Sequence, residues 1–174
     1  MASRKYIEKK IMTAQNNLHL MIIGRSEPIT FVGYEKLLAI PAKIDTGAYR
    51  SAVHADNIHL DDDGCLHFTL FAGHPTCADC ATEVVTNKFT KTSISNSFGD
   101  TEERYEVVLK VKIGPKVFKE SFTLANRAKK IYPILLGRKL LNDRFLINPA
   151  FTGISRNDLK VKYNISLPDD EEDK

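Results

Sequence analysis

The sequence predicts a mainly β protein, a closed or sandwiched β barrel with little helix. Short apolar runs recur along the chain, and each one stops at a turn rich in Gly, Pro or Asp. Only two stretches have a helical pattern, and neither is long enough to form a scaffold. The 174 residues, 43% of them hydrophobic, are enough for one compact domain with a substantial core.

The expected strands follow one another along most of the chain. The first three stop at Gly24, at Gly33 and at the turn Asp45-Thr46-Gly47. A further turn follows at residues 61–64, and Gly114-Pro115 joins the last two strands as a hairpin. The expected strands are residues 18–23, 31–34, 37–44, 66–71, 83–89, 105–113 and 117–124.

Two short helices complete the expected elements. One covers residues 6–15, and the other covers residues 138–143, opening after Gly137. We expect an N-terminal extension over residues 1–17, a β-barrel domain over residues 18–165 and a disordered acidic tail over residues 166–174.

The charge is unevenly distributed along the chain. The formal net charge is +3, but the last six residues, DDEEDK, carry −4, which leaves +7 on the rest. The basic residues form no stripe with interleaved aromatic residues, so we expect no nucleic-acid partner and favour an anionic small molecule or an acidic peptide. No apolar stretch is long enough for a membrane span or a leader. The expected location is the cytoplasm, although a leader removed upstream would leave the same sequence.

Three cysteines, an odd count, argue against a secreted disulfide framework and are compatible with a reducing compartment. Five residues that zinc can bind nevertheless fall within sixteen positions, and one of the two pairs is a cramped Cys-x-His. We therefore expect no metal and interpret this segment as a polar loop with a reactive pair of thiols. The five residues are Cys65, His67, His74, Cys77 and Cys80.

Two elements about ninety residues apart indicate chemistry. In the first, an apolar strand leads into Asp45-Thr46-Gly47-Ala48, where the glycine permits a tight turn that presents the carboxylate at a rigid strand end. In the second, the apolar run 132–136 closes on Gly137-Arg138 before a short helix. The pair is far more specific than either element alone.

Together these elements resemble the retropepsins, the single-lobe aspartic peptidases of retroviruses. The sequence is most similar to a bacterial and archaeal retropepsin-like family often labelled "ATP-dependent zinc protease", and the likeness covers about residues 21–149. The resemblance implies a single-lobe closed barrel of the acid-protease type, with Asp45, Thr46 and Gly47 as the catalytic turn. The other matching segments are Ile23-Gly24-Arg25, Ser51-Ala52-Val53-His54-Ala55, Ser97-Phe98-Gly99 with Arg104, and Asn126-Arg127.

The sequence also departs from the viral pattern. Viral retropepsins have an acid four residues after the catalytic Asp that pairs with the Gly-Arg arginine, whereas this chain has Tyr49, so Arg138 needs another partner. The glycine-rich flap is missing, and residues 97–100 are the only flap-like turn. No ATP-binding or zinc-protease motif is present, so we expect no cofactor.

A single lobe supplies one catalytic carboxylate, so aspartic catalysis requires a homodimer in which two copies of Asp45 share a proton. We assign Arg50, Arg104, Arg127, Arg138 and Ser97 to substrate binding, because arginines pair with carboxylates. His54 is expected to pack rather than to act as a base.

Members of this family often occur with ATP-grasp ligases that add glutamates to proteins, so the resemblance implies an acidic or glutamylated peptide as substrate. The alternative is a catalytically inactive module that dimerises and binds a peptide.

Overall fold

The computed structural model describes residues 20–95 and 101–166. Its helices are η2 (Pro75–Cys80), α2 (Arg138–Leu141) and α3 (Arg156–Tyr163). Its strands are β1 (Met21–Ile23), β2 (Ser26–Phe31), β3 (Ile40–Ile44), β4 (Ser51–Leu60), β5 (Leu66–Leu70), β6 (Thr82–Thr86), β7 (Phe89–Ser95), β8 (Thr101–Ile113), β9 (Lys116–Ala125), β10 (Ile134–Leu136) and β11 (Phe145–Ile147).

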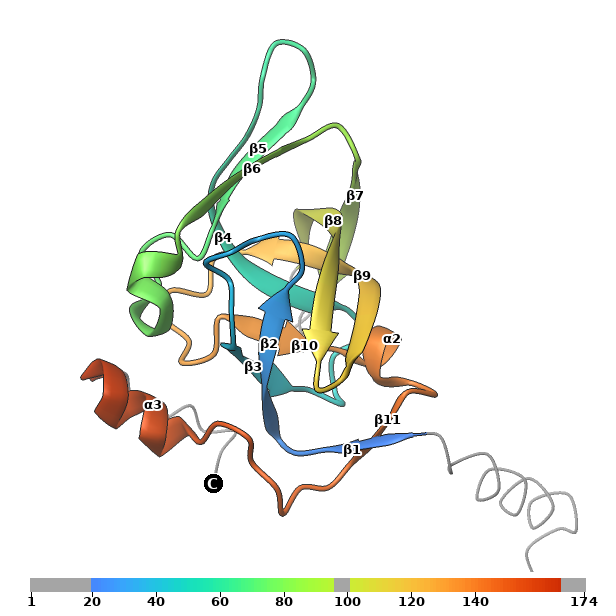
Figure 1. The fold of residues 1–174 in the computed structure, drawn as a ribbon. Coiled ribbons are helices and arrows are strands. Elements are labelled where there is room, and N and C mark those ends of the chain that lie inside the picture. Colours follow the sequence, from blue (N-terminus) through green and yellow to red (C-terminus); the bar gives the residue numbers. More distant parts are fainter. Residues whose placement is uncertain (1–19, 96–100, 167–174) are drawn as a thin grey trace, which may run out of the picture.

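Six strands close into a barrel, which confirms the predicted fold class. Around the ring the order is β10, β3, β2, β8, β9 and β4. The ring closes because β10 pairs in parallel with β3 on one side and antiparallel with β4 on the other (Figure 1). The predicted hairpin at Gly114-Pro115 joins β8 to β9, and α2 follows Gly137 as expected.

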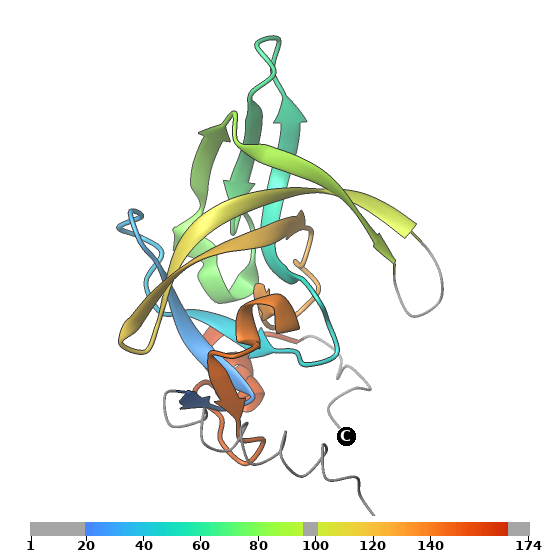
Figure 2. The ribbon, with the colours of Figure 1, turned by 90° about the vertical axis from the view of Figure 1, so that its right-hand side faces the viewer.

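Two hairpins extend from the barrel. β5 and β6 add to the far half of β4, and β7 pairs with β8 to form a long ribbon that projects beyond the ring (Figure 2). The only flap-like turn expected from the sequence, residues 97–100, lies outside the described residues. β4 changes environment along its length, because residues 51–55 are buried in the barrel while most of the outer half is exposed.

The barrel encloses one main hydrophobic core. Phe31 is its centre and contacts the rings of Phe71 and Phe122, with centroid separations of 5.5 and 6.2 Å. Outside the barrel, β1 and β11 form a separate two-stranded parallel sheet, and α3 packs against Ile131 and Tyr132 through Leu159.

Three expected segments fall partly or wholly outside this description. The N-terminal extension over residues 1–17, the helix over residues 6–15 within it, and all of the acidic tail except residue 166 lie outside the described residues. Within the described ranges, no helix is long and apolar enough to cross a membrane.

Candidate active site

Asp45 stands immediately after β3, at the point where the strand leaves the barrel. Its backbone N–H donates to the carbonyl of Leu136 in β10 at 2.9 Å. Its carboxylate oxygen Oδ1 accepts from the N–H groups of Gly47 at 2.8 Å and Ala48 at 3.0 Å. The turn therefore fixes both the backbone and one carboxylate oxygen of Asp45, while Thr46 and Gly47 are exposed beside it.

Gly137 is packed directly beneath this turn. A Cβ at this position would lie 2.5 Å from the carbonyl oxygen of Arg50, a distance that real side chains do not reach, so a glycine is required here. The N–H of Gly137 donates to the hydroxyl of Ser51 at 3.1 Å, and Ser51 is itself buried. Ser51 is thus a structural acceptor and is not placed as a nucleophile.

The side chain of Arg138 binds the backbone of the Asp45 turn. Its Nη1 donates to the carbonyl oxygens of Thr46 at 2.9 Å and Gly47 at 2.6 Å. These bonds replace the carboxylate partner, which is missing because position 49 is a tyrosine and its side chain has no carboxylate. The task that the sequence left open for Arg138 is therefore to brace the Asp45 turn.

A cavity of about 450 Å³ opens beside the turn, between the barrel end and the β7–β8 ribbon. All four arginines singled out from the sequence line this arginine cleft, and its lining in the described part of the chain includes no Asp or Glu. Ser97, the fifth residue assigned to substrate binding, lies outside the described residues. The lining residues are Gly47, Ala48, Tyr49, Arg50, Ala52, Ser93, Ile94, Arg104, Thr123, Arg127, Leu135 and Arg138.

Comparison with known proteins shows the family to which the chain belongs. The family model for the retropepsin-like aspartic endopeptidase RimB matches residues 22–158. The chain belongs to the RimB-like family. In a solved structure of a Legionella pneumophila protein of unknown function, the matched region is 28% identical with a TM-score of 0.59, and it covers 76% of this chain and 95% of that one.

Curated relatives of this RimB-like chain are larger proteins. A probable alpha-L-glutamate ligase of Desulfotalea psychrophila is 35% identical over 131 residues, which are 74% of this chain and 28% of the relative. One with the same name from Shewanella pealeana is 30% identical over 149 residues, which are 81% of this chain and 31% of the relative. The chain thus spans about a third of the length of these relatives.

The arginines of the arginine cleft differ in how firmly they are held in this RimB-like chain. Arg104 pairs with Glu102, an exposed neighbour on β8. Arg50 donates from Nε to Glu106 at 3.4 Å, and Glu106 also accepts from Lys139. Burial alone would raise the pKa of Glu106, but the hydrogen bond from Ser121 and the charges of Lys139 and Arg50 outweigh it and lower that pKa. Glu106 is therefore an anion that Arg50 already contacts.

The backbone of Arg127 is held by His54, a buried histidine that sequence reasoning did not link to the site, and a second buried histidine, His74, lies against His54. The backbone N–H of Arg127 donates to Nδ1 of His54 at 2.8 Å, so the proton of His54 is on Nε2, which donates to the carbonyl of Ala72 at 2.9 Å. The rings of His54 and His74 lie 5.1 Å apart. His54 has the packing role expected of it, and both ring nitrogens are used in holding backbone.

The second histidine, His74, is held in the neutral form. Its Nε2 donates to the carbonyl of Lys130 at 3.0 Å, and its Nδ1 accepts from the hydroxyl of Thr76 at 2.9 Å. Burial, together with the proximity of His54, lowers the pKa of His74 to about 4. The pair therefore fixes the loop that carries Arg127 without placing a charge in the core.

The residues considered as zinc ligands do not fit a metal site. Cys77 and Cys80 are joined by a disulfide rather than being the free thiol pair expected from the sequence. His67 is 2.8 Å from a carboxylate oxygen of Asp61, and His74 is bound as described above. In residues 20–95 and 101–166, no three His, Cys, Asp or Glu side chains are grouped in a way that could hold a metal.

Proposed function

We propose that the protein is an aspartic peptidase that hydrolyses acidic or glutamate-rich peptides as a homodimer. The observation that supports this best is the placement of Asp45: its carboxylate is oriented by the N–H groups of Gly47 and Ala48, and these two residues line the cleft together with four arginines. Arginine guanidinium groups bind carboxylates in a bidentate manner, so a cleft of this composition suits glutamate side chains. We place this activity in the cytoplasm.

A second copy of the chain is needed because one lobe supplies one catalytic carboxylate. The sheet of β1 and β11 favours such a partner. Its register pair Ile22 and Leu146 is 63% and 40% exposed. Two-stranded sheets are marginally stable by themselves, and parallel sheets are normally covered on both faces, so this sheet gains stability by pairing with a second copy.

In the proposed dimer the two copies of Asp45 meet and share one proton, because two carboxylates at close range cannot both ionise; aspartic proteases are the standard example of this behaviour. The ionised Asp45 takes a proton from water, whose oxygen attacks the scissile carbonyl carbon. The protonated Asp45 donates its proton to the carbonyl oxygen. Collapse of the resulting gem-diol breaks the C–N bond: the amine leaves with a proton from the dyad, and a gem-diol hydroxyl returns its proton to the dyad as the new carboxylic acid forms. No covalent intermediate forms.

The names of the relatives support an acidic substrate. Proteins named probable alpha-L-glutamate ligase contain a segment similar to this chain. A peptidase beside a ligase that joins glutamate would act on the ligase's product, which accounts for a cleft that is rich in arginine. We therefore propose a functional link to ATP-grasp glutamate ligases.

The decisive variant is Asp45→Asn. Asn keeps the shape and one acceptor oxygen but cannot ionise, so cleavage of α-linked oligoglutamate should fall by at least about a hundredfold, while binding of the peptide persists. Cleavage is measured by chromatography of the products, and binding by fluorescence anisotropy of a labelled peptide. The control is Asp62→Asn, which makes the same change on an exposed turn and should leave both unaltered.

Wild-type turnover in Asp45→Asn would refute the aspartic mechanism. Binding without any cleavage by the wild-type protein, across acidic and neutral peptides, would instead favour a peptide-binding module.

A further inference from the structure

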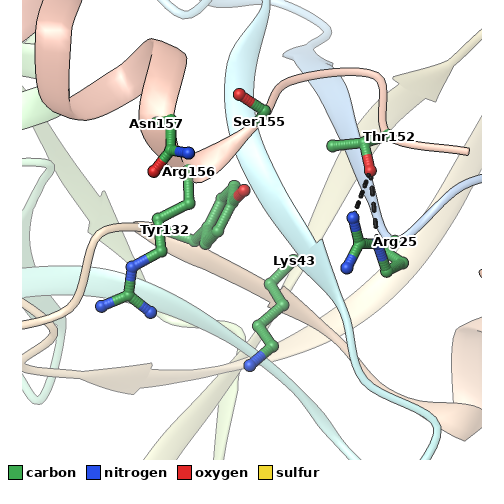
Figure 3. Close-up of a pocket in the computed structure, with 7 residues that line it drawn as sticks. All are labelled: Arg25, Lys43, Tyr132, Thr152, Ser155, Arg156 and Asn157. Carbon is green, nitrogen blue, oxygen red and sulfur yellow. Dashed lines mark hydrogen bonds between the residues drawn. The ribbon is translucent and has the colours of Figure 1, made fainter. Parts of the chain in front are cut away.

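A second cavity, of about 250 Å³, lies where α3 begins against the barrel, and we call it the α3 pocket (Figure 3). Among the lining side chains in residues 20–95 and 101–166, three are cationic and none is acidic. In Figure 3 the side chains of Lys43 and Arg156 extend in the same direction, whereas Arg25 is turned toward Thr152. The lining residues are Arg25, Lys43, Tyr132, Thr152, Ser155, Arg156 and Asn157.

The α3 pocket and the arginine cleft lie on neighbouring strands of one surface. Lys43 of β3 lines the pocket, and its register partner in β10 is Leu135, which lines the cleft. Both are half-buried, whereas their neighbours in the two strands point into the core. Because side chains alternate along a strand, Asp45 follows Lys43 on this same outward face. Asp45 therefore comes two positions after Lys43, which lines the α3 pocket, and two positions before Gly47, which lines the arginine cleft.

A hydrogen bond also connects the residues that line the arginine cleft with those that line the α3 pocket. Nε of Arg127, in the arginine cleft, donates to the carbonyl of Tyr132 at 3.1 Å, and Tyr132 lines the α3 pocket. The hydroxyl of Tyr132 in turn donates to the carbonyl of Ile154 at 2.9 Å, just before α3. The position of α3 is therefore coupled to the wall of the cleft.

Both the side chain and the backbone of Arg25 are held by hydrogen bonds. Its Nε and Nη2 both reach the hydroxyl of Thr152, at 3.3 and 3.1 Å. Its backbone N–H donates to Phe151, and its carbonyl accepts from Ile44, each at 2.8 Å. A guanidinium fixed in this way loses little side-chain entropy on binding an anion.

The start of α3 adds to the positive potential of the pocket. Ser155 caps the helix by accepting from the N–H of Asp158 at 3.0 Å, and the next two residues, Arg156 and Asn157, line the cavity. The first turn of a helix carries a partial positive charge. Three cations and a helix start, with no acid among the lining residues that the structure describes, make an environment suited to a carboxylate.

We propose that the α3 pocket is a second anion subsite, which takes a side-chain carboxylate of the same acidic peptide whose scissile bond lies at Asp45. This inference rests on the function proposed above. One carboxylate would bind in the arginine cleft and another in the α3 pocket, on either side of the Lys43–Leu135 pair. The enzyme would then select a run of acidic residues rather than a single glutamate.

The test compares long and short probes on the Asp45→Asn protein, in which cleavage is suppressed. Labelled octaglutamate should reach both cavities, whereas triglutamate should occupy the arginine cleft alone. Lys43→Gln and Arg156→Gln should each weaken octaglutamate binding by about tenfold, the loss of one charge-assisted contact, and leave triglutamate binding unchanged. Lys162→Gln is the matched control, since it removes an exposed charge from the same helix outside the pocket.

Lys43 and Arg156 lie on different elements, β3 and α3, so if one variant fails to fold, the other variant still tests the proposal. The subsite is refuted if both variants bind octaglutamate as the parent does, or if they weaken triglutamate equally. Because cleavage by the otherwise wild-type protein is measured separately, the two proposals fail separately. Cleavage with unchanged octaglutamate affinity in both variants refutes the subsite alone, whereas binding through both cavities without cleavage refutes only the peptidase.

Discussion

Arg104 and Arg127 line the same cleft but are held by different kinds of contact. Arg104 pairs with the exposed carboxylate of Glu102, a contact that water and salt already weaken. Arg127 instead supports protein backbone, because its Nε bonds the half-buried carbonyl of Tyr132. Both guanidinium groups suit the carboxylate of a substrate, but only one of the two is also part of the scaffold.

We therefore expect Arg104→Ala and Arg127→Ala to differ in stability. Each should weaken binding of oligoglutamate by about 1.5–3 kcal/mol, the range for a hydrogen bond to a charged group. Arg127→Ala should in addition lower the free energy of unfolding by about 1 kcal/mol, because the carbonyl of Tyr132 loses its donor. Anisotropy titrations and urea unfolding of both variants check this. Equal stability of the two would contradict the scaffold role of Arg127.

At the scale of elements, local pattern predicted most strands and missed the long β4. Residues 51–55 combine Ser and His with small apolar residues, and both polar side chains are buried because distant backbone groups satisfy them. All of β2 except its last residue, Phe31, was also missed, since Ser26-Glu27-Pro28 has the composition of a turn. The rest of the expected strand 31–34 is not in a strand. The sequence stretch 83–89, expected as one strand, is divided between β6 and β7.

The candidate site shows the same limit of local pattern. The Asp45 turn and Gly137 were predictable because a short motif marks each of them. The contact of His54 with Arg127 spans 73 positions, and α3 has a single buried residue, so neither leaves a local signal. The gathering of the four arginines matches the groove that was expected, and their role in binding stays a prediction.

The disulfide in η2 should make the thermal stability of the protein sensitive to reductant. Cys77 and Cys80 are three positions apart, so their link closes a very short loop and stabilises the fold by about 2 kcal/mol. Reductant should lower the Tm of the wild-type protein by several degrees and leave a Cys77→Ser/Cys80→Ser variant unchanged. Cys65→Ser, which removes the free cysteine, should respond to reductant as the wild type does. If the Tm of Cys65→Ser did not respond to reductant, the effect would come from Cys65 and the prediction for the Cys77–Cys80 disulfide would be wrong.

For the whole molecule, His74 predicts how stability depends on pH. The pKa of His74 is lowered from 6.5 to about 4 in the fold, so between these values the unfolded chain binds a proton that the folded chain does not. The contribution of His74 to the free energy of unfolding should therefore be complete above pH 6.5. As the pH falls toward 4, the free energy of unfolding should decrease by on the order of 2–3 kcal/mol. Urea unfolding at several pH values measures this. His74→Gln should flatten the dependence, whereas the exposed His59→Gln should retain it.

The dimer is a second property of the whole molecule. Ile22→Glu places a charge on the exposed face of the β1–β11 sheet and should convert the proposed dimer to monomer, with loss of turnover. Sedimentation velocity and the cleavage assay are run on the same samples. Val161→Glu, which changes an exposed apolar residue on α3, is the control. An active monomer would exclude the shared Asp45 dyad.

The insertion of β10 between β3 and β4 also determines when in folding the site can exist. Arg138 and Thr46 are 92 positions apart, and the N–H of Asp45 finds its acceptor only after β10 is in place. Contacts this distant in sequence form late and slowly, because the chain must first close a long loop. A nascent chain that has reached β9 therefore has most of a barrel but lacks the Leu136 acceptor and the Arg138 side chain that hold the Asp45 turn, so the proposed cleavage site is completed in the same step that completes the fold.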